Sequence, residues 1–304
     1  MRIGFALPVS GSWATPENVV HVAGRAQALG YHAVWTFQRL LSTPDWAPVY
    51  RSVLDPLTTL AYAAAVTTDV RLGVAVVNLP FVTPVLLAKQ AATLDVLSGG
   101  RLDLGLGLGW ADEEYRASGV SKRHQVRRAE EFIATVRTLW TQGDVAHDGE
   151  FYHVPPSNAL PKPVQPGGPP ILLGGLAPGA LARAGRLADG WVSSSRADLS
   201  GIGDAVGAVK RSAEQAGRDP ESLRFICRGV VKVRSPGAAS TDAPLTGTFD
   251  TIRADIARLG EQGITELFVD LNFDDEIGSP DADPATSLAR ADEALAALAP
   301  APPW

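Results

Sequence analysis

Two glycine-rich segments offer the backbone positions at which this chain could hold a ligand. The first, Gly105-Leu-Gly107-Leu-Gly109, alternates glycine with leucine and is followed by Trp110. Because glycine has no Cβ, a flat or phosphorylated ligand can approach the backbone there. Close packing between a strand and a helix would use the same glycines, and the spacing alone leaves both interpretations open.

The second segment, Leu173-Gly174-Gly175-Leu-Ala-Pro178, has the pattern of a strand that passes into a helix. The free N–H groups and the dipole of a helix N-terminus bind phosphate. We therefore predict a phosphate site at Gly174 and Gly175. A tight turn that binds nothing is the alternative.

Sequence motifs that would hold a metal or carry hydrolytic chemistry are missing. The five histidines, at positions 21, 32, 124, 147 and 153, do not pair with carboxylates at metal-ligand spacing, so we expect no metal site. The sequence has neither a Gly-x-Ser-x-Gly motif nor a Walker phosphate loop. These features argue against a hydrolase or a metalloenzyme and favour a protein whose cofactor supplies the reactivity.

The elements that would position these segments alternate between strand and helix along the chain. The pattern predicts eight strands, each followed by a helix, which is typical of a (β/α)8 or TIM barrel of the α/β class. A doubly wound open sheet is the alternative, but Gly4-Phe-Ala-Leu-Pro8 after the first strand is not a dinucleotide fingerprint. We predict one domain over residues 1–304, with a short insertion at about 144–169 between the fourth helix and the fifth strand.

Active sites of such barrels form at the C-terminal ends of the strands. The residues predicted at these ends are rich in amides and hydroxyls and include no histidine and no cysteine. They are Pro8, Ser10, Gln38, Arg39, Ala75, Val76, Asn78, Gly107, Gly109, Trp110, Gly174, Gly175, Ser193–Arg196, Asp270 and Asn272, with Trp35 and Phe37 nearby. Gln38 can orient a carbonyl but cannot act as a general base, and Arg39, in a polar loop, stays charged. Glu113 and Glu114 are interpreted as carboxylates of a surface helix.

The composition narrows the class of partner. The formal net charge of −6 argues against nucleic acid or an anionic membrane as the main partner. The single cysteine, Cys227, cannot form an intrachain disulfide, is expected to pack in the core, and fits a reducing compartment. We find no signal-peptide pattern and no segment apolar enough to span a bilayer, so we expect a cytoplasmic protein.

The segment Arg71–Trp110 resembles the most recognisable stretch of the bacterial luciferase-like superfamily of flavin- and deazaflavin-dependent oxidoreductases. The resemblance rests on an LAKQ helix core, an SGGR turn and a GxGxGW strand end, in this order. It extends to four further segments, Met1–Pro8, Ala33–Leu41, Ile171–Trp191 and Leu245–Leu271. It implies a barrel oxidoreductase that binds a flavin-type ring, acts on a small molecule and forms a homodimer.

The resemblance also implies roles for individual residues. The Gly174–Gly175 turn and Asp189-Gly190-Trp191 would help hold the phosphate end of the cofactor. At Ala75–Val76, a bulge with a non-prolyl cis peptide would support the face of the ring. Many family members have an Asp-His pair where this chain has Gln38-Arg39, and sugar-phosphate-oxidising relatives carry an acid where it has Trp110. These departures argue against a sugar-phosphate dehydrogenase.

The leading hypothesis is an oxidoreductase that transfers hydride between the deazaflavin F420 and a small, largely apolar substrate. The cofactor would be bound by Ala75, Val76, Asn78, Gly107, Gly109, Gly174 and Gly175. The substrate wall would consist of Phe37, Trp46 and Trp110, and an anionic group would meet Arg39 or Arg196. The catalytic residue stays open, with Gln38, Arg39 and Trp110 as candidates.

Two alternatives remain: an FMN-dependent luciferase-like monooxygenase, and a flavin- or deazaflavin-binding protein with little catalysis. The scarcity of acid–base groups favours F420, because hydride transfer from carbon asks little of protein side chains. The small residue that begins Ala75-Val76-Val77-Asn78 also looks more like the deazaflavin-using members. The long acidic tail of F420 counts against it, since few basic groups are placed near the predicted site.

Overall fold

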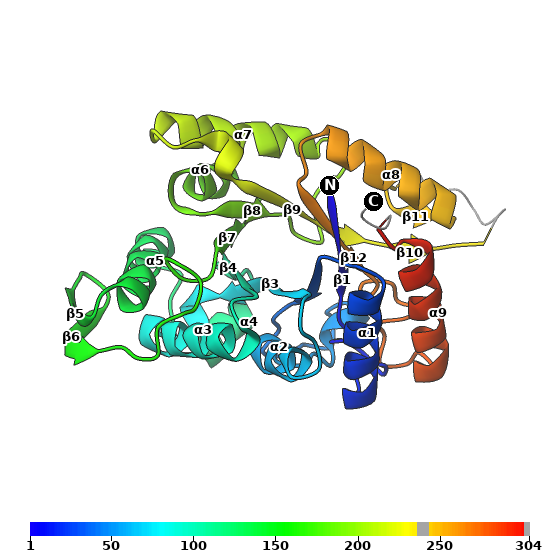
Figure 1. Ribbon diagram of the computed structural model, residues 1–304, viewed down its shortest axis with the longest axis horizontal. Coiled ribbons are helices and arrows are strands. Elements are labelled where there is room, and N and C mark those ends of the chain that lie inside the picture. Colours follow the sequence, from blue (N-terminus) through cyan, green and yellow to red (C-terminus); the bar gives the residue numbers. More distant parts are fainter. Residues whose placement is uncertain (236–242, 301–304) are drawn as a thin grey trace.

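Eight parallel strands close into a barrel in the order β1-β12-β9-β8-β7-β4-β3-β2 (Figure 1). The computed structural model describes residues 1–235 and 243–300 of the chain. The barrel strands are β1 (Arg2–Ala6), β2 (Ala33–Thr36), β3 (Arg71–Asn78), β4 (Leu102–Gly107), β7 (Ile171–Gly174), β8 (Gly190–Val192), β9 (Arg224–Val230) and β12 (Glu266–Asp270). The predicted (β/α)8 fold is confirmed.

Helices follow each barrel strand and surround the barrel (Figure 1). They are α1 (Pro16–Ala28), α2 (Pro56–Ala64), α3 (Pro84–Ser98), α4 (Asp112–Ala117), α5 (Gln125–Thr141), α6 (Pro178–Leu187), α7 (Ile202–Gln215), α8 (Phe249–Glu261) and α9 (Pro284–Ala297). The antiparallel hairpin β5 (Asp144–Asp148) and β6 (His153–Asn158) lies between α5 and β7, where the insertion was predicted. A short parallel pair, β10 (Lys232–Val233) and β11 (Thr246–Gly247), lies outside the barrel.

Local sequence signals fix where the helices begin and end. The side chains of Thr15, Asp55 and Thr83 accept hydrogen bonds from the first turns of α1, α2 and α3, and each cap is followed by a proline. Gly99 ends α3 with φ of 68°, a left-handed conformation that glycine adopts readily. None of the described helices is both long and apolar enough to cross a membrane.

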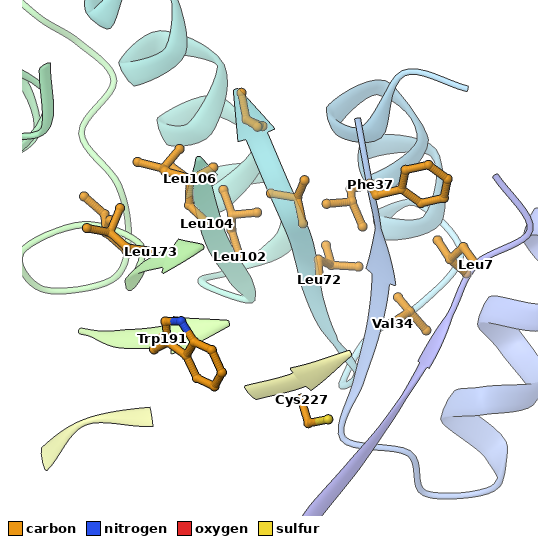
Figure 2. Packing of buried hydrophobic residues seen from close by; sticks show 14 of the residues in the cluster. Leu7, Val34, Phe37, Leu72, Leu102, Leu104, Leu106, Leu173, Trp191 and Cys227 are labelled. Atoms are coloured by element: carbon orange, nitrogen blue, oxygen red, sulfur yellow. The ribbon is translucent and has the colours of Figure 1, made fainter. Parts of the chain in front are cut away.

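Successive side chains of a barrel strand point alternately toward the helices and toward the barrel axis. The core therefore has an outer layer, between strands and helices, and an inner layer inside the barrel. On β4, Leu102, Leu104 and Leu106 pack in the outer layer with Leu72 of β3 (Figure 2). Cys227 of β9 lies in the same layer, fully buried, and burial raises the pKa of its thiol to about 12. The predicted core role of Cys227 is therefore confirmed.

The inner layer is built around Trp35. Its indole stacks on Phe268 with ring centroids 4.9 Å apart, and its Nε1 donates to Glu266 at 3.0 Å. A Cβ added at Gly73 would lie 2.4 Å from this indole, so glycine makes room for it. Trp35, expected near the active site, fills the middle of the barrel: it shares a buried cluster with Ala75 but does not line the pocket described below.

An ionic network closes the end of the barrel opposite the strand C-termini. Asp103 is fully buried and accepts hydrogen bonds from Arg71 and Arg224, each at 2.7 Å or less. Burial alone would raise the pKa of Asp103, but the bonds from the two arginines bring it below its usual value. Arg224 also donates to Glu266 at 2.9 Å, so the two buried carboxylates share one guanidinium.

His32 borders this network and makes the fold sensitive to acid. Burial, followed by the charges of Arg2 and Arg224, lowers the pKa of His32 from 6.5 to about 4. As the pH falls from about 6.5 to about 4, His32 therefore becomes protonated in the unfolded chain while it stays neutral in the folded chain. The stability from neutral His32 is complete above pH 6.5, and we expect about 2–3 kcal/mol of it to be lost by pH 4.

Urea denaturation of the parent and of His32→Asn between pH 7 and pH 4 measures this effect. Asparagine does not titrate, so the variant should lose less stability across this range. Identical pH profiles for the two proteins would exclude His32 as the titrating group.

Candidate active site

A pocket opens at the C-terminal ends of the barrel strands, where the strand order places the predicted site residues side by side. The residues predicted for catalysis, cofactor binding or substrate contact line this pocket, except Trp46, Arg196 and the Asp189-Gly190-Trp191 segment. The lining consists of Phe37, Gln38, Arg39, Tyr50, Ala75, Val76, Asn78, Gly107, Leu108, Gly109, Trp110, Gly174, Gly175, Ala180, Arg183, Val192, Ser193, Ser194, Ser195, Arg228 and Phe273.

The floor of the pocket is a bulge in β3. The pairing of β3 with β4 shifts register between Val74 and Val77, and the Ala75–Val76 peptide is cis, as the family resemblance implies. A Cβ added at Gly107 would lie 2.6 Å from Val76 Cγ2, and one at Gly105 would lie 2.1 Å from the Val74 carbonyl oxygen. The glycines of β4 are therefore needed first to fit the bulge of the neighbouring strand.

Two polar side chains hold this bulge in place. Gln38 Oε1 accepts from the Asn78 amide at 2.9 Å, which ties the end of β2 to the end of β3. Arg228 reaches across the barrel from β9, and its Nη1 donates to the Ala75 carbonyl at 3.3 Å. Its Nε donates to the buried Asp270 at 2.7 Å, so the cation is paired. Sequence reasoning missed Arg228, although a charged residue in an apolar strand was a usable signal.

Aromatic rings form one wall of the pocket around Arg39. Its guanidinium lies about 5 Å from the centroids of Trp46, Tyr50 and Trp110. Arg196 lies 4.6 Å from the Trp110 ring, so two arginines contact that indole. Trp46 packs against Trp110 with centroids 5.1 Å apart and supports the wall from behind.

The prediction that Glu114 is a carboxylate on a surface helix is wrong. It is fully buried, its Oε2 lies 3.3 Å from Arg39 Nη1, and its Oε1 accepts from the Leu40 amide at 2.8 Å. The short helix α4 turns this residue inward, onto the loop that follows β2, while Glu113 pairs with Arg116 near the surface. Burial lowers the pKa of Arg39, and Glu114 opposes that shift.

The predicted phosphate turn lies at the C-terminal end of β7, next to β4 in the barrel. Gly175 has φ of 131°, and a Cβ there would lie 2.7 Å from Ala180 Cβ, so the turn packs closely on α6. Trp191 Nε1 donates to the Gly175 carbonyl at 2.8 Å, and Asp189 accepts from the Ile171 amide at 2.8 Å. The Asp-Gly-Trp segment therefore anchors the turn from β8.

These features fit the two parts of a flavin-type cofactor. The bulge and the glycine backbone give a flat apolar surface for a ring, and the turn gives amides beside a buried cation, Arg183, for a phosphate. The described lining contains no histidine, cysteine or carboxylate, so Tyr50 and the serines are its neutral proton-bearing groups.

Fold and site together define a (β/α)8 barrel with a pocket at the C-terminal ends of its strands. Residues 1–298 match the family described as luciferase-like monooxygenase. The chain belongs to this luciferase-like family.

Curated relatives match part of the chain. An uncharacterised protein of Mycobacterium tuberculosis is 39% identical over 171 residues, which are 56% of this chain and 60% of that protein. The oxygenase component of a flavin-dependent trigonelline monooxygenase from Acinetobacter baylyi is 34% identical over 157 residues, 51% of this chain and 42% of that protein. The chain thus matches three fifths or less of the length of these relatives.

Solved structures share the fold over almost the whole chain. Monooxygenase RslO1 from Streptomyces bottropensis superposes with a TM-score of 0.81 at 23% identity, covering 98% of both chains. An F420-dependent secondary alcohol dehydrogenase in complex with an F420-acetone adduct superposes with a TM-score of 0.77 at 17% identity, again over 98% of both chains. At these identities the likeness establishes the barrel fold.

Proposed function

We propose that this protein is an F420-dependent oxidoreductase that transfers hydride between the deazaflavin and a small, largely apolar organic substrate. The observation that carries the proposal is the chemistry of the pocket: amides, aromatic rings and arginines, with no imidazole, thiol or carboxylate among its described lining residues. Such a set can bind and orient reactants but offers little for multistep proton transfer. The acidic tail of F420 still counts against the proposal, because the lining residues Arg39 and Arg228 are already paired with Glu114 and Asp270.

The chain's own residues would bind and position the reactants. Ala75 and Val76, held by Arg228 and Gln38, would support the ring, while the Gly174–Gly175 turn would face the phosphate. The cofactor would supply the two-electron hydride exchange with a substrate carbon. A proton on the substrate heteroatom would exchange with water that reaches the pocket.

The aromatic wall would select the substrate. Trp110 and Phe37 line the pocket and favour an apolar body, and Trp46 backs Trp110. Arg196 contacts Trp110 from the rim and has no carboxylate partner among the described residues, so it could meet an anionic group. Arg39 is less available for that role than the sequence indicates, because Glu114 already pairs with it.

An FMN-dependent monooxygenase is the second candidate. It is supported by the flavin-dependent trigonelline monooxygenase and by an FMNH2-dependent dimethylsulfone monooxygenase of Pseudomonas putida, 34% identical over 138 residues. The phosphate turn and the bulge would serve FMN as well as F420. A protein that binds either ring but turns over little would have the same pocket.

Titration of the apoprotein with F420 and with FMN in one buffer, followed by absorbance and fluorescence, tests the proposal. We expect F420 to bind at micromolar concentration and FMN to bind at least about tenfold more weakly, a difference of about 1.4 kcal/mol. Micromolar FMN binding without detectable F420 binding would make the monooxygenase the better assignment. F420 binding without turnover of any carbonyl or enone in a substrate panel would leave a binding protein.

We also propose that the protein forms a homodimer. The exposed face of α3 supports this: Val85 and Leu86 at its start and Val96 and Leu97 at its end are 41–71% exposed, with the polar Lys89, Gln90 and Thr93 between the two pairs. A second copy of the same face would cover it symmetrically. Sedimentation analysis that finds only the mass of a single chain at micromolar concentration would contradict this proposal.

A further inference from the structure

Arg183 is a cation on the wall of the pocket that has no partner among the described residues. It lies in the second turn of α6 and is 6% exposed, yet it makes no hydrogen bond or ion pair with any residue of 1–235 or 243–300. The nearest carboxylate that acts on it, Glu130, is already bonded to Arg186 at 2.7 Å. Burial disfavours the charged guanidinium and lowers the pKa of Arg183. The side chain lines the pocket, so an anion bound there would give this guanidinium the acceptor that the described residues do not supply.

The N-terminus of α6 faces the same pocket. Ala177 precedes the helix and offers no side-chain cap, and Pro178 brings no N–H, so the first turn lacks its usual acceptor. Gly174, Gly175, Ala180 and Arg183 all line this side of the pocket. The helix dipole and the guanidinium therefore favour negative charge at one place.

Arg183 differs from the other arginines that line the pocket, because they are paired with carboxylates. The lining cations Arg39 and Arg228 each have a buried carboxylate within 3.3 Å, Glu114 and Asp270 respectively. Arg183 has no such partner in the described part of the chain. An anion at the α6 turn would thus be bound without displacing an existing ion pair.

We propose that Arg183, together with the backbone of the Gly174–Gly175 turn, binds the phosphate of the cofactor. The assignment rests on the proposed function, because the phosphate belongs to the ring-bearing molecule. It adds a cation that neither the glycine pattern nor the family resemblance indicates. A guanidinium can give two parallel hydrogen bonds to phosphate oxygens, which lysine cannot reproduce.

Arg183→Met tests the proposal, since methionine has a similar length and is apolar. Calorimetric titrations compare F420 with its phosphate-free deazaflavin, and FMN with riboflavin. We expect the variant to bind the phosphorylated forms at least about tenfold more weakly and the phosphate-free forms as the parent does. Arg183→Lys should recover part of the loss. Arg186→Met, on the exposed side of the same helix, is the matched control and should change neither affinity.

Thermal unfolding without ligand gives a second readout. A structural arginine would destabilise the protein when removed, whereas Arg183→Met should leave the Tm unchanged or raise it, because an unpaired buried charge is lost. Inorganic phosphate at millimolar concentration should raise the Tm of the parent and not that of the variant. Gly175 is a poorer probe, because its φ of 131° would strain any other residue.

The outcomes separate this proposal from the proposed function. Equal weakening of phosphorylated and phosphate-free forms, or a clearly lower Tm for Arg183→Met, would overturn the phosphate role of Arg183. Tight F420 binding that is unchanged by the substitution would do the same and leave the proposed function standing. If neither cofactor binds the parent but phosphate still acts through Arg183, the phosphate site stands and the proposed function fails.

Discussion

Replacing Glu114 by glutamine is expected to lower the free energy of unfolding by about 3–5 kcal/mol, the cost of leaving a buried ion unpaired. The Glu114 side chain is fully buried and that of Arg39 is 7% exposed, with 3.3 Å between the charged groups. Glutamine can still accept from the Leu40 amide, so the loss isolates the charge. The three aromatic rings around Arg39 cannot replace a carboxylate, since a cation–π contact is worth about 1–2 kcal/mol. Urea denaturation of the two proteins measures the difference.

Two further variants make the result interpretable. Arg39→Met combined with Glu114→Gln removes both charges and should regain most of the lost stability. Glu113→Gln, one residue away and near the surface, should change stability by less than about 0.5 kcal/mol. A loss for Glu114→Gln as small as that of Glu113→Gln would show that the pair contributes nothing to folding.

The barrel could be predicted from the sequence because its signals are local. Asp55 and Thr83 cap their helices through residues three positions later, and Gly99 ends α3 by its own backbone conformation. β-branched and apolar runs bounded by such signals indicate where the strands lie. The order of the strands in the barrel then follows from the right-handed crossover of each strand–helix–strand unit.

The charged part of the site depends on contacts that no local pattern encodes. Glu114 meets the amide of Leu40, 74 positions earlier, because α4 lies over the loop after β2. Arg228 faces the barrel because it shares the register of Ile226, whereas Cys227 between them faces the helices. The two-residue period of β9 held that information, but which face points inward is decided only when the barrel closes.

The role of the β4 glycines, Gly105 and Gly107, could not be predicted from the sequence either. Their pattern was visible, but the reason for it lies in the neighbouring strand. At Gly107 an added Cβ would lie 2.6 Å from Val76 Cγ2, the tip of a side chain that lines the pocket. At Gly105 it would lie 2.1 Å from the Val74 carbonyl oxygen, which belongs to the β3 backbone.

We therefore expect Gly107→Ala to lose about 1–3 kcal/mol of stability by overpacking, and to bind the cofactor more weakly because Val76 must move. Val76→Ala in the same chain should restore the stability, since it removes the methyl group in conflict. Gly105→Ala should be more destabilising, and Val76→Ala should not rescue it, because a backbone atom cannot be trimmed away. Denaturation midpoints and cofactor titrations of the four variants provide the comparison. If Val76→Ala restored stability equally in the Gly105→Ala and Gly107→Ala proteins, β3 would be shifting as a unit. The Val76 side chain would then not be the specific reason for glycine at position 107.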